Sequence, residues 1–525
     1  MKKKFLYFFK YCLLFYFLLL TNLNAANVNV SSDNEIESDD TSNKYIFDAA
    51  DQTLTIKSDV TAGASSANQN IQIDEQDNAT IVIESGATLQ GTNTLIKGND
   101  SDGLTVTNSG TISASTNRAI NLLDATNATI TNNSGAIISA ATGNTINGAI
   151  NDGSVSGNTI TNSGTIYATS GVAVRFYNTS TSTTITNNSG GVIYNNSTDE
   201  TIRLGGSSTL TNAGKIENKN DPSNDAIDIE GNSSTITLKD GGILIGKIRS
   251  AGTSNTLKIQ HGVGQSYFYE TAGNDMTLQD LDGNQVVKGS AGSVGQGGNE
   301  NIDELLGYKS LNIRKSLDKF VKSEGFKNKE TEWQGIQATS LERKEHTKNL
   351  ALGYEFYSLG VNIIRPSENE NVIASFEYSE QDFQKDHTIK RYNLLFGLHY
   401  NESENKFKDN SFILAGATLN EGERKILTNT TSSGTLNIND TYESFEIHAG
   451  KRFKNKSLIP NLGTNLSYSY TPDHSESKYY SWDDKHVANF SLDLSDEFSI
   501  EREKSKSKFG IGWVLDYRNL ITGSK

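Results

Sequence analysis

The chain has 525 residues, with 47 basic and 62 acidic side chains, a net charge of −15, 4 prolines and 1 cysteine. A single cysteine excludes a disulfide-stapled scaffold and a cysteine-based zinc module. A net negative chain is also a poor candidate for nucleic-acid binding, which depends on clustered lysine and arginine. The charge is uneven, because residues 27–300 carry a net −16 and residues 301–525 only −3.

Residues 1–26 have the layout of a secretory signal peptide. Lysines at 2–4 precede an apolar run from Phe5 to Leu20, and the small residues Ala25 and Ala26 follow. Cleavage after either alanine fits this layout. The apolar run is short for a membrane-spanning helix, so an uncleaved membrane anchor is the alternative.

A phrase of the type Thr-Asn-Ser-Gly-Thr-Ile recurs within residues 27–282. Its glycines follow one another at intervals of 25, 29, 26 and 24 residues: Gly110, Gly135, Gly164, Gly190 and Gly214. Degenerate copies lie around Gly86 and Gly241. Each period of about 26 residues holds only two or three very short alternating segments between turn residues, which leaves no room for a helix. The repeats therefore predict a parallel β-helix of about eight turns between residues 45 and 260, right-handed by the usual rule for parallel crossovers.

Three sets of side chains are expected to stack from turn to turn. The apolar anchors of a second phrase predict one buried column: Ile120, Ile150, Val174, Ile202 and Ile227. The residues that follow them predict an outward column: Asn121, Asn151, Arg175, Arg203 and Asp228. We interpret this outward column as a solvated face with an ion pair between turns, with a sugar- or anion-binding stripe as the alternative. The asparagines of the first phrase predict a ladder that stabilises the turns rather than a ligand site: Asn108, Asn132, Asn162, Asn187 and Asn212.

The repeat region offers little catalytic chemistry. Residues 27–260 contain no histidine, which excludes a Ser-His-Asp or Cys-His nucleophile there. Neither a metal-ligand pattern nor a phosphate-binding loop is present. We therefore predict no catalytic, cofactor-binding or metal-binding residues, and no enzyme. The alternative is an exported β-helix enzyme that acts on polysaccharide through Asp225, Asp228 and Glu230, which would require these carboxylates to share one cleft.

The second half of the chain changes pattern twice. Residues 283–330 comprise a glycine-rich linker followed by a helical pattern over residues 302–321. From residue 331 to 525 the chain alternates apolar with polar or small residues over segments of about ten residues. This pattern is typical of a transmembrane β-barrel, with a soluble β-sandwich as the alternative. We expect nine strands, near 332–340, 349–361, 371–380, 389–400, 410–420, 441–453, 461–471, 486–500 and 507–518.

A leader, a repeat β-helix, a linker helix and C-terminal antiparallel strands, in this order, resemble a type V autotransporter of Gram-negative bacteria. The run Glu-Trp-Gln-Gly at 332–335, with residues 350–361, 372–383 and 390–400, is similar to the opening strands of the autotransporter translocator domain. The resemblance implies a twelve-stranded outer-membrane barrel with the linker helix in its pore, inserted by the barrel-insertion machinery. It also implies an extracellular, adhesin-like or spacer passenger whose ligand, protein or glycan, is unknown.

The chain departs from that family at its C-terminal end. We count nine strands instead of twelve, and the last residues, Thr-Gly-Ser-Lys, lack the terminal aromatic residue that the family uses for insertion. An open nine-stranded sheet would expose unpaired edges to lipid. We therefore expect about three strands to be missing, and a chain that ends at Lys525 to fail to close a stable barrel. A truncated gene and a natural fragment both fit, and the sequence does not indicate whether the passenger is cleaved from the barrel.

Overall fold

The computed structural model describes residues 25–64, 69–148, 155–261, 267–279, 291–294, 302–321, 332–344, 354–368, 370–383, 387–400, 410–453, 461–477, 479–482, 484–502 and 505–522. Residues 1–24 of the predicted signal segment 1–26 and most of the predicted glycine-rich linker lie outside these residues. The chain forms two compact units, described here in turn. Within the described residues, none of the helices is both long and apolar enough to span a membrane.

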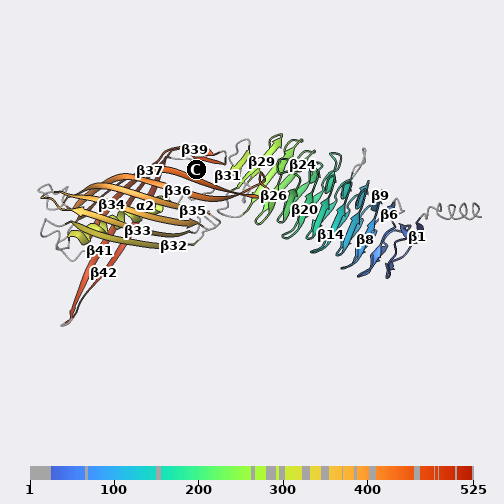
Figure 1. Ribbon diagram of the computed structural model, residues 1–525, viewed down its shortest axis with the longest axis horizontal. Coiled ribbons are helices and arrows are strands. Elements are labelled where there is room, and N and C mark those ends of the chain that lie inside the picture. The colour runs from blue at the N-terminus through green and yellow to red at the C-terminus, as the bar shows by residue number, and fades with distance from the viewer. Residues whose placement is uncertain are drawn as a thin grey trace, which may run out of the picture. The chain divides into compact units, whose positions relative to one another are not determined.

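The first unit is a parallel β-solenoid of roughly nine turns, which confirms the predicted parallel β-helix (Figure 1). Its handedness stays a prediction. Each complete turn contributes one short strand to each of three parallel sheets, and the first and last turns lack a described strand in the third sheet. The first sheet contains β1 (Ala26–Val30), β3 (Asn43–Phe47), β6 (Gln69–Asp74), β9 (Thr94–Asn99), β12 (Ile120–Leu123), β15 (Ile146–Gly148), β18 (Val174–Phe176), β21 (Ile202–Leu204), β24 (Asp225–Ile229), β27 (Lys247–Ser250) and β29 (Tyr267–Gly273).

The other two sheets complete the turns. The second contains β2 (Asn34–Ile36), β4 (Thr53–Ile56), β7 (Thr80–Ile83), β10 (Thr105–Asn108), β13 (Thr129–Asn132), β16 (Thr159–Asn162), β19 (Thr184–Asn187), β22 (Thr209–Asn212), β25 (Thr235–Lys239), β28 (Thr256–Gln260) and β30 (Thr277–Gln279). The third contains β5 (Thr61–Ala62), β8 (Thr88–Gly91), β11 (Thr111–Ala114), β14 (Ile137–Ala140), β17 (Thr165–Ala168), β20 (Val192–Asn195), β23 (Lys215–Asn218) and β26 (Ile243–Ile245). A short strand, β31 (Ala291–Val294), lies within the predicted linker.

The predicted apolar column is present, but one of its members is wrong. The register pairs Ile120 with Ile146 and Ile146 with Val174, and the column continues through Ile202 and Ile227, all fully buried. Ile146 therefore occupies the position predicted for Ile150, and Asn147 occupies the one predicted for Asn151. Ile150 and Asn151 lie outside the described residues. The sequence is ambiguous here because Thr145-Ile146-Asn147 and Ala149-Ile150-Asn151 are near copies of one phrase.

The asparagine ladder is confirmed and is fully buried. Each side chain donates from Nδ2 to Oδ1 of the asparagine one turn ahead, at 2.9 Å for Asn108 to Asn132 and at 2.8 Å for each of the next three steps. The same amides also donate to backbone carbonyls of the turns, as Asn162 does to Gly164 and Val192. Apolar residues end the ladder on both sides, because Asn108 pairs with Ile83 and Asn212 with Leu238. A buried polar stripe is tolerated because its amides are hydrogen-bonded.

The turns that follow the ladder alternate between two lengths from β7 to β23. Two residues connect β10 to β11, β16 to β17 and β22 to β23, whereas four connect β7 to β8, β13 to β14 and β19 to β20. In the four-residue turns the glycine has a left-handed backbone, as at Gly190 (φ 83°). In the two-residue turns the glycine allows close approach, because a Cβ at Gly164 would lie 2.3 Å from the carbonyl oxygen of Ala136. Asn133 and Asn188 of the longer turns donate to Ser109 and Ser163 of the shorter turns one turn before them.

The second unit is an antiparallel sheet that carries one helix. The helix, α2 (Ile302–Val321), has the predicted bounds. The described long strands overlap each of the nine expected positions, and most extend further: β32 (Trp333–Arg343), β33 (Tyr354–Arg365), β34 (Glu370–Phe383), β35 (His387–Tyr400), β36 (Ser411–Thr428), β37 (Thr435–Phe453), β38 (Asn461–Thr471), β41 (Lys485–Arg502) and β42 (Ser505–Thr522). A short hairpin that was not expected, β39 (His474–Ser477) and β40 (Tyr480–Trp482), precedes β41.

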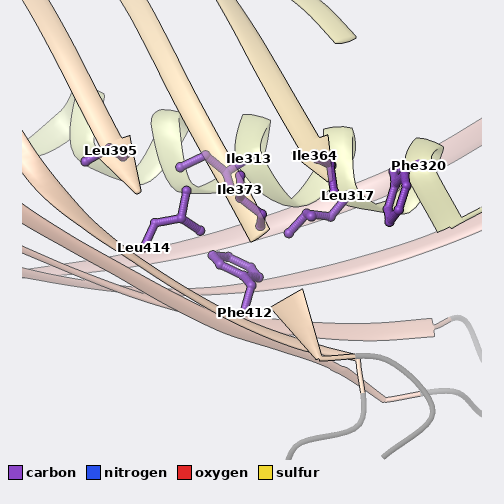
Figure 2. Close-up of a cluster of buried hydrophobic side chains, with 8 residues drawn as sticks. All are labelled: Ile313, Leu317, Phe320, Ile364, Ile373, Leu395, Phe412 and Leu414. Carbon is purple, nitrogen blue, oxygen red and sulfur yellow. The ribbon is translucent and has the colours of Figure 1, made fainter. Parts of the chain in front are cut away.

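The helix packs against one face of this sheet through an apolar cluster (Figure 2). Ile313, Leu317 and Phe320 of α2 meet five buried residues of β33 to β36: Ile364, Ile373, Leu395, Phe412 and Leu414. Around this cluster most of the covered face is polar, as the next subsection describes. The apolar contact therefore places the helix on the sheet at one defined position.

Val174 tests the stacking of the apolar column. We expect Val174→Asp to lower the free energy of unfolding by about 3–5 kcal/mol, because an unpaired carboxylate would be buried between Ile146 and Ile202. The measurement is urea unfolding of the full chain, monitored by circular dichroism. Thr186→Asp, at a half-exposed position of β19, is the control with the same charge change. Equal loss of stability in the two variants would contradict the column.

The ladder allows a test with one substitution at two positions. Asn162→Leu leaves both Asn132 and Asn187 without their ladder partner, so we expect a loss of about 2–4 kcal/mol. Asn212→Leu should cost only about 1 kcal/mol, because Asn212 is the last member and already pairs with Leu238. Unfolding of both full-length variants in urea measures the difference. A larger loss at Asn212 than at Asn162 would show that the ladder does not stabilise the turns.

Candidate functional site

The three carboxylates singled out from the sequence lie on one turn of the solenoid. Asp225 and Asp228 belong to β24, and Glu230 follows its end. Asp228 is buried, whereas Glu230 is partly exposed beside the end of its strand. Charge interactions connect these residues to Glu200 and to arginines of the neighbouring turns. The structure therefore brings them into one charged cluster.

Arginines pair with two of these carboxylates. Arg203, one turn before, contacts Glu200 at 2.5 Å and Glu230 at 3.0 Å. Arg249, one turn after, contacts Asp228 at 3.3 Å. Burial alone would lower the pKa of Arg203, but the carboxylate of Glu200 and its neighbours raise it above the ordinary value. The pairs Arg203–Glu230 and Arg249–Asp228 are ion pairs between turns of the solenoid, whereas Glu200 and Arg203 lie three residues apart on the same turn.

Asp228 is the one carboxylate of the cluster with a strongly shifted proton affinity. Burial raises its pKa to about 6, although Arg249 opposes the shift. Burial likewise raises the pKa of Asp225, against the attraction of Arg249 and Lys247. One oxygen of Asp228, Oδ1, is buried without a hydrogen-bond partner. In the described part of the chain, acidic, histidine and cysteine side chains do not gather in groups of three or more that could bind a metal ion.

The antiparallel unit shows the opposite burial pattern from a water-soluble sheet. Along β33 to β36 many polar side chains on one face are buried, among them Ser358, Asn362, Glu377, Asn393 and Thr418. Large apolar side chains on the opposite face are exposed: Tyr357, Leu359, Ile363, Val372, Phe376, Tyr392, Leu394, Phe396, Ile413 and Leu419. The apolar positions continue across strands, because Phe376 lies opposite Leu394 and Leu394 opposite Ala417. The sheet thus has a continuous apolar outer face.

Polar side chains of α2 bind the polar face of the sheet. Lys309 Nζ donates to Glu446 of β37 at 2.7 Å, and Arg314 Nε donates to Asn465 of β38 at 2.6 Å. Asn312 donates to Thr339 of β32 at 2.8 Å. Hydrogen bonds from helix residues therefore reach strands near both ends of the described sheet.

Glu446 is the centre of the largest of these networks. Besides Lys309, its carboxylate accepts hydrogen bonds from Thr418 at 2.9 Å and Asn393 at 3.2 Å, and lies 3.1 Å from His448. This network was not predicted from the sequence. The ion pair joins residues 137 positions apart, and no local spacing signals such a contact. The pair Glu200–Arg203 was missed as well, although its spacing of three residues was available.

Comparison of the chain with protein-family models, curated proteins and solved structures finds no match in any of the three.

Asp228 gives a pH-dependent prediction. Because its folded pKa of about 6 exceeds that of an unfolded aspartate, the folded state binds the extra proton, and stability should fall as the pH rises from about 4 to 6. The substitution Asp228→Asn removes this pH-dependent contribution to stability. We expect the variant to be more stable than the parent by about 1–2 kcal/mol at pH 7 and equal to it near pH 4. Urea unfolding of the full chain at both pH values measures this, with the exposed Asp240→Asn as control. A parent that is the more stable protein at pH 7 would contradict it.

Proposed function

We propose that the antiparallel unit is the membrane-embedded β-barrel domain of an outer-membrane autotransporter. In this proposal α2 lies on the inner, polar side of the barrel. The solenoid is the passenger, carried outside the cell after export through the periplasm, where it acts as an adhesin-like module or as a spacer. The observation that carries the proposal is the reversed burial of the antiparallel sheet.

The reversal is sharpest on β35. Tyr392 is 36% exposed and Leu394 45%, whereas Asn393, which lies between them, is 2% exposed. Exposing a continuous band of such residues to water is unfavourable at about 25 cal/mol per Å², but the same band is stable against lipid. Large exposed apolar patches mark interaction or membrane surfaces.

The strands also have suitable lengths. A tilted strand crosses the hydrocarbon region with about 9–11 residues, and β33, β34 and β35 have 12, 14 and 14 residues. The longer strands β36 and β37, with 18 and 19 residues, leave a surplus that would extend beyond the bilayer. Helix α2 supports the proposal because it covers polar side chains that would otherwise require water.

One observation favours the second candidate, an exported β-helix enzyme acting on polysaccharide. Asp228, with a pKa of about 6, has the proton affinity of a general acid. Its pairing with Arg249, and that of Glu230 with Arg203, argue against a free acid and base working as a pair. We therefore place the passenger role first.

Spin labels on β35 test the lipid-facing surface directly. In a Cys12→Ser background, cysteines introduced at positions 393, 394 and 396 of the full chain are labelled with a nitroxide in detergent micelles. We expect oxygen, which concentrates in the apolar phase, to relax labels at 394 and 396 several-fold more than the label at 393. If the unit is a soluble sandwich, a water-soluble nickel chelate should relax the labels at 394 and 396 as strongly as oxygen does. That result would overturn the membrane assignment.

Display of the solenoid needs a separate experiment in cells. The protein is expressed in a Gram-negative host from its complete coding sequence, whether or not that extends beyond codon 525. A single cysteine replacing the exposed Ser115 should react with a membrane-impermeant maleimide on intact cells. As the matched control, a cysteine replacing the buried Ser250 should react only after denaturation. Labelling at 115 only after lysis would contradict surface display.

A further inference from the structure

One arginine of the outward column lacks the counter-charges of its neighbour. Arg175 of β18 and Arg203 of β21 are register partners with the same place on the sheet. Arg203 is held by Glu200 and Glu230. In contrast, none of the ion pairs among the described residues includes Arg175, and its Nε is buried without a hydrogen bond. Its guanidinium instead lies 4.4 Å from the ring centre of Tyr177.

A second arginine interacts electrostatically with Arg175 and Tyr177. Arg118 precedes β12, two turns before Arg175, and is half-buried. Burial lowers its pKa, the positive charge of Arg175 lowers it further, and Tyr177 opposes the shift. The Nε of Arg118 is also buried without a partner. Two guanidinium groups and one tyrosine thus gather on the sheet with their charges uncompensated by the described residues.

Among the residues that the structure describes, this arrangement is unfavourable for folding alone. Partial burial of like charges that lack an opposite charge destabilises both ionised groups. Carboxylates on the same or a neighbouring turn would remove this destabilisation, as Glu200 and Glu230 do for Arg203. A ligand with a compact oxyanion would supply the missing charge, and guanidinium groups bind such anions through paired hydrogen bonds.

The surroundings narrow the class of ligand. A densely charged polyanion is disfavoured, because residues 27–300 carry a net charge of −16 and would repel it. Next to the arginines stand exposed hydroxyl and amide side chains, Thr116 and Asn117 beside Arg118 and Asn178 beside Tyr177. These groups suit the hydroxyls of a sugar ring.

We propose that Arg118, Arg175 and Tyr177 form a binding site for the carboxylate or sulfate group of an acidic sugar. The proposed site depends only on contacts within the solenoid. It goes beyond the proposed membrane function, and either proposal can be correct without the other. The proposal assigns to the passenger a glycan ligand that presents one anionic group to the two arginines. Asn147 is the column residue between Asn121 and Arg175, and it donates a hydrogen bond to Asn121 and accepts one from Asn144.

The test is calorimetric titration of the full chain in detergent with four probes. Hyaluronan tetrasaccharide offers a carboxylate, 6-sulfo-N-acetyllactosamine a sulfate, chitotetraose a neutral chain, and sodium sulfate the free anion. We expect at least one of the two acidic sugars to bind, and the neutral sugar and the free anion to bind on the order of ten-fold more weakly or not at all. Failure of both acidic sugars to bind would overturn the proposal. Free sulfate binding as tightly as either sugar would overturn the assignment to a sugar.

The double variant Arg118→Gln/Arg175→Gln should lose on the order of ten-fold or more in affinity for the acidic sugar, with each single variant between it and the parent. Lys239→Gln/Lys258→Gln, on the second sheet, removes the same charge and should bind as the parent does. Without ligand, the Arg118→Gln/Arg175→Gln chain should unfold at the same or a higher temperature than the parent, which separates loss of binding from loss of folding. Unchanged affinity in a folded double variant would overturn the proposal.

Discussion

Stacking of equivalent residues on successive turns is the constraint on which the solenoid depends. Each short strand has three to seven residues in most turns and could not persist alone, so its backbone groups and side chains are satisfied by the turns on either side. The same geometry that stacks isoleucines in a dry column also stacks amides in the ladder from Asn108 to Asn212. Once the register is set by these two columns, every outward position is stacked too. The charged cluster around Asp228 and the arginines around Tyr177 are consequences of that register.

The antiparallel unit obeys a different constraint. Its strands alternate as the solenoid strands do, but large apolar side chains lie on the exposed face and, apart from the cluster under α2, the covered face is mostly polar. The inner polar groups then need partners, and α2 supplies several of them through Lys309, Asn312 and Arg314. Burial of these groups without the helix would leave charged and amide side chains unsatisfied, which is costly. Helix and sheet are therefore a single hydrogen-bonded structure.

Periodic features were predictable from the sequence, and non-periodic ones were not. The asparagine ladder follows from asparagines that recur once in each repeat. The helix over Ile302–Val321 and the positions of the antiparallel strands follow from apolar residues at regular intervals. The predicted column was wrong at Ile150 because two near-identical phrases lie four residues apart. Only the pairing of neighbouring strands determines which of them enters the column. The partners of Asp228 and Glu446 could not be foreseen. Arg249 follows Asp228 by 21 residues, less than the period, and Lys309 is separated from Glu446 by 137.

The alternation of two-residue and four-residue turns makes a pair of turns the smallest unit by which this rod can change length. From Gly110 to Gly164 is 54 residues and from Gly164 to Gly214 is 50, and each interval contains one turn of each kind. Recombination that removes a single turn brings two turns of the same length together and separates Asn133 or Asn188 from its serine. Removal of a pair restores every contact. Rods descended from a common ancestor should accordingly differ in length by multiples of about 10 Å, since two turns advance the solenoid by twice the ~4.8 Å strand spacing.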